Sequence, residues 1–180
     1  MISSNAQASI EGLFMKAVRS RLPQEAEDTC DIVLLARDEN SMNVRDSNVV
    51  FLTISSIQFR ILLVFHFDED ERTRGYFVKD VEEGSLRDAL LETCNLCCGA
   101  MNQELLRYFP DLGMSTPYVL SARCLSYLEE LKPDYLASYA ITISGSVKLG
   151  ATVCFCAHAP VDFIADVNMA EETSGELELF

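Results

Sequence analysis

Residues 84–109 have the sequence GSLRDALLETCNLCCGAMNQELLRYF, which contains few helix breakers and predicts one long helix. At about 100° per residue, one side of that helix collects polar or small residues: Asp88, Glu92, Asn95, Gly99 and Asn102. The opposite side collects mainly apolar residues: Leu90, Cys94, Cys97, Met101, Leu105 and Tyr108. The stretch therefore predicts an amphipathic helix that packs its apolar side on a core and turns acids, amides and a glycine outward.

Two residues on the polar side weaken the helix that carries them. Gly99 costs about 1 kcal/mol of helix propensity relative to alanine, and asparagine, as at Asn95, is mildly unfavourable in mid-helix. A glycine on the exposed side indicates that another molecule comes close to the backbone there. Asn95 donates and accepts hydrogen bonds but cannot act as a general base. A site of carboxylates and an amide, without a nucleophile, must work by positioning, which supplies much of the catalysis in phosphoryl transfer.

The spacing of these residues resembles the active helix of the CheC/CheX/FliY family of chemotaxis response-regulator phosphatases. That helix carries Asp or Ser, three residues, Glu, two residues and Asn, with a proline farther along the chain. The matching residues in this sequence are Asp88, Glu92, Asn95 and Pro117. Gly99 stands where the family usually has glycine. Ala100 departs from the pattern, because the family normally has a second asparagine there; Asn102 lies nearby at a different position.

The resemblance implies a substrate and a role for each residue. The substrate would be the phosphoaspartate of a CheY-like response regulator, in chemotaxis or another two-component pathway. Asn95 would orient the attacking water and Glu92 would pair with a lysine of the regulator, which makes these two the catalytic residues. The remaining residues would bind the partner: Asp88, Gly99, Asn102 and Pro117. The chain would need no cofactor of its own, since the Mg²⁺ would belong to the regulator.

The first predicted helix bears on the number of sites. Two-site members of the family carry a second Glu-x2-Asn there, and this chain has Phe14 where that asparagine would follow Glu11. A single active helix implies the CheX type, whose members pair as homodimers. The alternative interpretation is a non-catalytic module on the same fold, either an adaptor that binds a regulator or a component like those of the flagellar switch.

Composition limits the class of protein. A length of 180 residues suits one domain, and 49% hydrophobic residues predict a globular one. A net charge of -14, with no run of basic residues, argues against binding nucleic acid. The N-terminus lacks the layout of a signal peptide, and the longest apolar run, residues 61–65, is too short to span a bilayer. We therefore expect a cytoplasmic location and no membrane partner.

Hydrophobic patterns predict the order of elements along the chain. Helices are expected at 4–22 and 84–109, with a short helical possibility at 125–134. Strands are expected at 31–37, 49–54, 57–67, 118–123, 135–145 and 147–158, the last two as an antiparallel pair. A charged loop is expected at 68–75 and an acidic tail at 159–180. This order predicts an α+β domain with helices on one face of a mostly antiparallel sheet. The resemblance implies the same CheX-like layout, over about residues 5–158.

Seven cysteines in a chain without a secretory signal are expected to be reduced thiols. One alternative is a zinc site formed by the cysteines of the motif helix and those of the last strand: Cys94, Cys97, Cys98, Cys154, Cys156 and His158. Cys94 and Cys97 fall on the buried side of the helix, however, where free cysteine is a common small core residue. That position favours packing, with no bound transition metal. His66, between Phe65 and Phe67, is interpreted as a core histidine with its hydrogen bonds satisfied, and not as a metal ligand.

Overall fold

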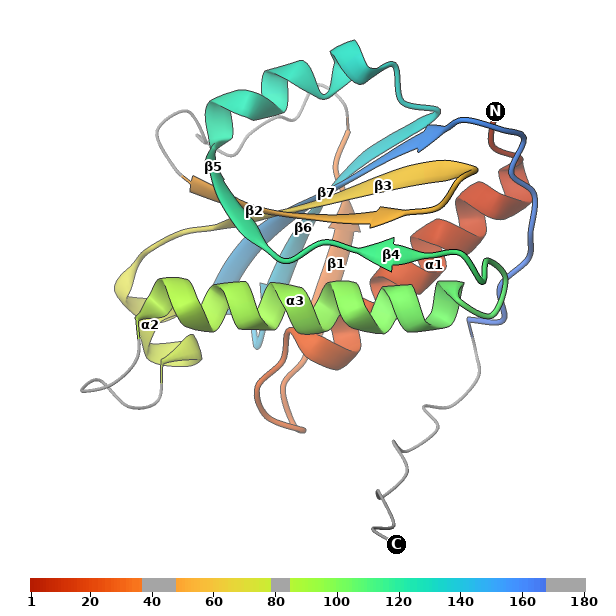
Figure 1. The fold of residues 1–180 in the computed structure, drawn as a ribbon. Coiled ribbons are helices and arrows are strands. Elements are labelled where there is room, and N and C mark those ends of the chain that lie inside the picture. The colour runs from red at the N-terminus through yellow and green to blue at the C-terminus, as the bar shows by residue number, and fades with distance from the viewer. Residues whose placement is uncertain (37–47, 79–84, 168–180) are drawn as a thin grey trace, which may run out of the picture.

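The computed structural model describes the chain except for residues 37–47, 79–84 and 168–180 (Figure 1). The helices are α1 (Ser4–Arg21), α2 (Glu71–Phe77) and α3 (Leu86–Leu105), with two 3-10 turns, η2 (Ala122–Tyr127) and η3 (Glu129–Leu131). The strands are β1 (Cys30–Leu34), β2 (Asn48–Ser55), β3 (Phe59–Phe67), β4 (Gly113–Met114), β5 (Tyr118–Ser121), β6 (Tyr135–Ile143) and β7 (Val147–Ala157). None of the helices that the structure describes is long and apolar enough to cross a membrane.

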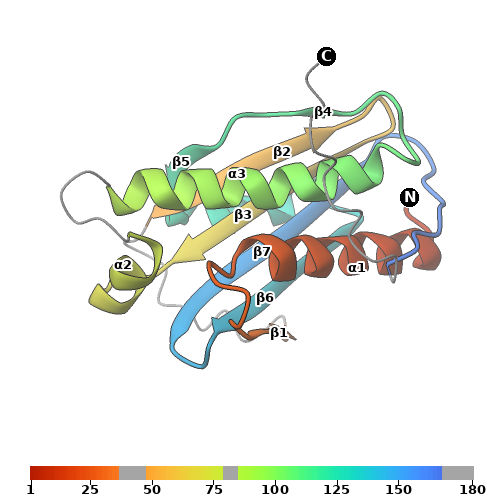
Figure 2. The ribbon, with the colours of Figure 1, turned by 90° about the horizontal axis from the view of Figure 1, so that it is seen from below.

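All described strands belong to one antiparallel sheet in the order β1-β6-β7-β3-β2-β4, and β5 also pairs with β2. The long strand β2 thus holds both short strands on the same edge, β4 opposite Ile54 and Ser55 and β5 opposite Asn48–Phe51. Helices α1 and α3 lie side by side across one face of this sheet (Figure 2). The predicted α+β architecture is confirmed.

The main core lies between the two long helices and the sheet. Phe14 of α1 is fully buried, and its ring centroid lies 5.1 Å from that of Tyr139 on β6 and 6.5 Å from that of Phe65 on β3. Complete burial of a side chain of this size stabilises a fold by about 1.5–3 kcal/mol. The inward-facing residues of the strands alternate with outward-facing ones, so the same strands also supply a second surface.

A smaller apolar cluster occupies the opposite face of the sheet, beneath η2 and η3. Its buried members come from the sheet and the two turns: Val49, Phe51, Val64, Ala122, Leu128 and Cys154. The predicted layout of helices on one face therefore holds for α1 and α3, while the 3-10 turns cover part of the other face (Figure 1). Residues 125–134, expected to contain a short helix, hold the end of η2 and all of η3, which are 3-10 helices and not α-helices.

The expected charged loop at 68–75 is wrong, because the structure has helix α2 at Glu71–Phe77. Asp70 caps this helix, its Oδ1 accepting a hydrogen bond from the backbone N of Thr73 at 2.8 Å. Thr73 and Phe77 are the buried residues of α2, and the Phe77 ring packs edge-on against Phe67 at 5.9 Å. The sequence did not predict this helix, because Thr73 and Phe77 lie among charged residues and form no visible apolar pattern. The motif helix also ends earlier than expected, at Leu105 rather than near residue 109.

Residues 159–167, expected to begin an acidic tail, pack along α1 and the C-terminal end of α3. Ile2 and Val161 form a parallel bridge, and Ser3 Oγ donates a hydrogen bond to Asp162 Oδ1 at 2.5 Å. Ser9 Oγ donates to the carbonyl of Phe163 at 3.2 Å and accepts from the backbone N of Ala165 at 2.9 Å. We call this segment the strap. It joins the last strand to both long helices.

At the end of the molecule away from the strap, the carboxylate of Asp28 joins three segments that are distant in the sequence: its own loop before β1, helix α2 and the turn between β6 and β7. Asp28 accepts hydrogen bonds from Ser144 Oγ at 2.6 Å and Tyr76 Oη at 2.5 Å. Ser144 and Gly145, with φ of 46° and 67°, make the turn of the β6–β7 hairpin, which confirms the predicted antiparallel pair. The hydrogen bonds from Ser144 and Tyr76 hold the pKa of Asp28 below its ordinary value of 3.8.

We expect Asp28→Asn to lower the melting temperature at pH 7 and to lose this effect in acid. A carboxyl whose pKa is depressed on folding stabilises the fold above its unfolded pKa, and this contribution disappears as the pH falls through the folded pKa. Melting both proteins from pH 7 down to about pH 3 should show the difference between them shrinking. Asp31→Asn, at an exposed aspartate of β1, is the control. A difference that grows as the pH falls would contradict the assignment.

Candidate functional site

Helix α3 begins where its sequence provides a cap. The backbone N of Asp88 donates a hydrogen bond to the side chain of the N-cap residue Ser85, at 3.2 Å. The Asp88 carboxylate in the first turn is also favoured by the helix dipole. The buried residues of α3 form one stripe: Leu86, Leu90, Thr93, Cys94, Cys97, Cys98, Met101 and Leu105. The predicted apolar side is confirmed except at Tyr108, which lies beyond the helix and is exposed.

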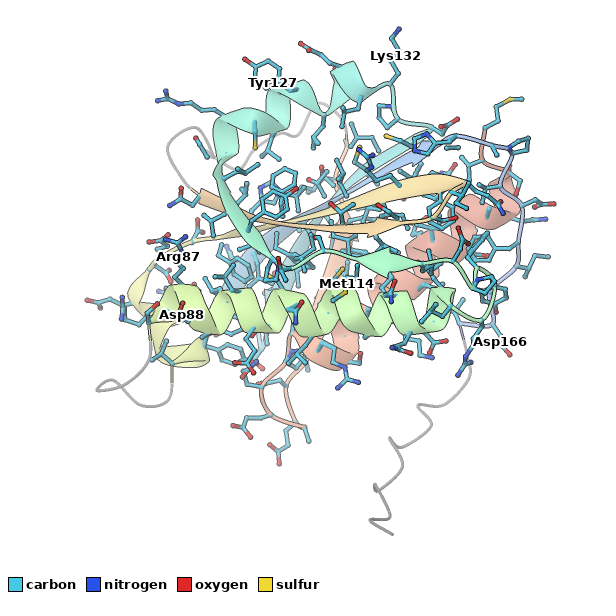
Figure 3. The ribbon with its side chains drawn as sticks, viewed as in Figure 1. Arg87, Asp88, Met114, Tyr127, Lys132 and Asp166 are labelled. Carbon is cyan, nitrogen blue, oxygen red and sulfur yellow. The ribbon has the colours of Figure 1, made fainter. Side chains whose placement is uncertain are left out.

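The residues that the sequence singles out lie on the outer side of α3. Asp88 and Glu92 are exposed, whereas Asn95, Gly99 and Asn102 are half-buried. Figure 3 shows Asp88 near the start of the helix, at the surface. The Asn102 Oδ1 atom is enclosed and has no hydrogen-bond partner within the part of the chain that the structure describes. The structure therefore presents Asp88, Glu92, Asn95 and Gly99 along one outer surface, with Asn102 at its inner border.

The two flanks of α3 differ. On one flank, Glu104 Oε1 binds Lys16 Nζ of α1 at 2.7 Å, which fixes the two helices against each other. Asn95 lies nine residues before Glu104, which is two and a half turns of the helix. The two side chains therefore point to opposite flanks, and Asn95 is on the flank away from α1. On that flank β4 and the chain leading to β5 run beside α3 (Figures 1 and 2). Pro117 lies in this connection.

The connection that carries Pro117 is itself held to the sheet. The backbone N of Ser115 donates to the carbonyl of Thr53 at 2.9 Å, and the backbone N of Thr53 donates to Ser115 Oγ at 2.9 Å. Proline has no N–H to donate and restricts the preceding Thr116 to extended conformations. The predicted partner-binding residues thus come from two elements that the fold places next to each other, α3 and the edge of the sheet.

Helix α1 offers no equivalent of the Glu-x2-Asn pair on its surface. Phe14, at the position corresponding to the asparagine, is in the core. Burial raises the pKa of both Tyr135 and Tyr139, and the nearby carboxylate of Glu11 raises them further. The two phenols, on β6, share a hydrogen bond at 2.7 Å between their oxygens. The number of active helices stays a prediction.

The cysteines considered for the zinc site fall into two groups separated by the sheet. Cys94, Cys97 and Cys98 are buried between α3 and the sheet, where burial raises the pKa of Cys98 to about 12. Cys154 and Cys156 face the opposite cluster beneath the 3-10 turns. The zinc alternative required both groups to meet, and the fold keeps them apart. Among the described residues, no three His, Cys, Asp or Glu side chains are arranged to hold a metal.

His66 is buried, as predicted, but its hydrogen bonding is incomplete, because Nδ1 has no partner among the described residues. Its Nε2 lies 3.3 Å from Thr152 Oγ1, and burial lowers its pKa to about 4. The imidazole is therefore neutral at physiological pH. It lies on the sheet face opposite α3.

One surface residue of α3 was not singled out from the sequence. Leu96 is 50% exposed and follows Asn95 directly. The signal that could have found it is its position one turn after Glu92, which places an apolar side chain on the polar side of the helix.

Comparison with known proteins places the fold. No family model matches the chain, and no curated protein matches it in sequence. Solved structures do match: the CheX chemotaxis protein of Vibrio vulnificus superposes with a TM-score of 0.56 at 16% identity, over 81% of this chain and 98% of that one. The chain has a CheX-type fold. The CheX of the CheX–CheY–BeF3–Mg²⁺ complex from Borrelia burgdorferi superposes with a TM-score of 0.55 at 8% identity, over 83% and 97% of the two chains.

The chain also resembles in fold a protein that is not a CheX. The middle domain of FliM from Vibrio alginolyticus superposes with a TM-score of 0.52 at 9% identity, over 82% of this chain and 91% of that one. At such identities the likeness establishes the fold alone. What the CheX-type fold does in this protein therefore has to be argued from the residues on α3.

The structure gives an expected outcome for Gly99. A Cβ built on Gly99 would meet no neighbouring atom within 4 Å, so packing within the chain does not require glycine there. Gly99→Leu should keep the stability of the fold or raise it by up to about 1 kcal/mol through helix propensity.

Gly12 of α1 is the matched control for this substitution. A Cβ there would lie 2.9 Å from Cγ1 of Val167, so Gly12→Leu should destabilise the protein by about 1–3 kcal/mol. Thermal or urea unfolding of both variants measures the contrast. A Gly99→Leu protein as unstable as Gly12→Leu would show that Gly99 packs against another element.

Proposed function

We propose that this protein hydrolyses the phosphoaspartate of a CheY-type response regulator. The observation that carries the proposal is the outer surface of α3, where Asp88, Glu92, Asn95 and Gly99 follow one another on an uninterrupted helix of a CheX-type fold. A solved neighbour with the same fold is a CheX protein in complex with CheY, BeF3 and Mg²⁺. Both observations favour a regulator as the partner of this surface.

The reaction needs little from the protein besides geometry. Water attacks the phosphorus in line, and the bond between phosphorus and the aspartate oxygen breaks. The products are the unphosphorylated aspartate side chain of the regulator and inorganic phosphate. Any Mg²⁺ would be held by the regulator, where it would neutralise charge on the phosphoryl group. Asn95, which can accept one hydrogen bond from the water and donate another to the phosphoryl group, would fix that water. An amide suits this role because it does not change charge during the reaction.

Glu92 would orient the complex. It lies three residues before Asn95 on the same exposed surface, close enough for one partner to contact both. A carboxylate here would pair with a lysine of the regulator, and such a pair governs orientation and association rate. Asp88, one turn earlier, would extend the same negative edge, and Pro117 would shape the neighbouring flank. The homodimer implied by the resemblance stays a prediction.

The second candidate function is a non-catalytic binding module. The likeness to the FliM middle domain favours it, as does Ala100 at the position where the phosphatase pattern has a second asparagine. The two candidates differ in one measurable property, since a module of this kind would bind the regulator and release no phosphate.

The first test is Asn95→Ala, measured as phosphate release from phosphorylated CheY-type regulators of the same cell. Loss of one preorganised polar group should cost about 2–4 kcal/mol in the transition state, or a 30- to 1000-fold lower rate, with binding almost unchanged. Asn5→Ala, at an exposed asparagine of α1, should have no effect. A variant of Asn95 that keeps more than about a tenth of the activity would rule out the assigned role.

The docking role of Glu92 calls for a separate measurement. Glu92→Lys should weaken binding to the activated regulator, because two ammonium groups would then face each other, and added salt should reduce the difference. Glu130→Lys makes the same change of net charge at an exposed site on the opposite side of the sheet and should leave affinity unchanged. Equal affinity of wild type and Glu92→Lys at low salt would exclude this contact.

A further inference from the structure

Gly99 leaves a notch in the surface of α3. On a helix the neighbours of a residue lie three and four positions away, which for Gly99 are Asn95, Leu96, Asn102 and Gln103. None of these four is charged, in a protein with a net charge of -14. Nothing in the described part of the chain fills the space where a side chain of Gly99 would begin. The notch is therefore open, uncharged and bordered by three amides and one leucine.

Leu96 is left unusually bare by its own neighbours. Its helical neighbours are Glu92 and Thr93 before it and Gly99 and Ala100 after it. Thr93 is buried, and Gly99 and Ala100 have the two smallest side chains, so of these four neighbours Glu92 alone has a long exposed side chain. Among the twenty residues of α3, all of them described, Leu96 is the large apolar side chain with high exposure, at 50%.

Exposed leucines are common on protein surfaces and need no special explanation when scattered. The position of Leu96 is what distinguishes it. It borders the notch on the flank nearer α1, while Asn95 borders it on the flank nearer Pro117, so a partner seated over Gly99 contacts both residues. Ala100, half-buried against the core, extends the same apolar surface by one turn.

We propose that Leu96, with Gly99 and Ala100, forms an apolar seat for one aliphatic or aromatic side chain of the response regulator. This inference rests on the proposed function and adds a partner-binding residue to it. The seat supplies affinity that does not depend on charge, whereas the contact of Glu92 is weakened by salt. The seat acts on binding and not on the chemical step, because Leu96 would contact the partner beside the amide that orients the water.

The test compares two leucines of equal exposure. Leu131 of η3 is also 50% exposed but lies over the opposite face of the sheet, where Figure 3 labels Lys132, the residue that follows it in the chain. Leu96→Ala and Leu131→Ala both keep an apolar residue, and alanine is the best helix former at position 96. Phosphate release gives KM and kcat, and titration with the regulator activated by beryllofluoride and Mg²⁺ gives Kd. Unfolding curves confirm that each variant is folded.

For Leu96→Ala we expect KM and Kd to rise about tenfold at both low and high salt, with kcat within about twofold of wild type. Leu131→Ala should match wild type in all three constants, and Leu96→Met should recover most of the affinity. Unchanged KM and Kd in Leu96→Ala, or equal losses in both alanine variants, would overturn the inference. So would a fall in kcat at constant KM.

The same experiment separates this inference from the proposed function. A wild-type protein that binds the activated regulator but releases no phosphate removes the phosphatase proposal, and the Kd values of the two alanine variants still decide the role of Leu96. A wild-type protein that neither binds any activated regulator of the cell nor releases phosphate from one removes both.

Discussion

The burial of one stripe of α3 against the sheet determines where every other residue of that helix points. Cys94, Cys97 and Met101 have almost no exposed surface, and interiors of this kind are packed as closely as organic crystals. A rotation of the helix by even a fraction of a turn would expose these side chains to water. The ion pair between Lys16 and Glu104 limits sliding along α1 as well. The outer residues are therefore held at fixed positions by contacts that they do not themselves make.

Such an arrangement suits a site that works by positioning. An amide on a loop would have to be ordered on each encounter, at an entropic cost of about 1–2 kcal/mol per backbone residue. Asn95 lies in the middle of a twenty-residue helix that is already rigid. The cost of placing a glycine and an asparagine in that helix is offset by the core contacts on its other side. Helix α3 thus contributes to the stability of the fold through its buried side chains and to the proposed site through a different set, its outer side chains.

The sequence predicted best where one strong pattern decides the outcome. The spacing of Leu90, Cys94 and Met101 is enough to orient α3, and the hairpin around Gly145 follows from two apolar runs and a turn. Helix α2 was missed because its two buried anchors, Thr73 and Phe77, lie among charged residues. The enclosed Oδ1 of Asn102 could not be predicted, since helical periodicity places this residue on the outer side and only tertiary packing encloses it. Asp28 gives no local signal either, because its partners Tyr76 and Ser144 are 48 and 116 residues away.

The strap connects regions that are almost the whole described chain apart, since Ser3 and Asp162 are separated by 159 positions. Contacts of such separation are the slowest to form, because the entropy of closing a long loop is lost before any contact compensates for it. The strap packs on elements that must already be folded, α1 and the residues after α3, so it is expected to close last during folding. It should also be the first part to open in the native protein, well below the free energy of global unfolding. The end of α3 near Tyr108 would then sample brief openings, while the half that carries Asn95 stays in place.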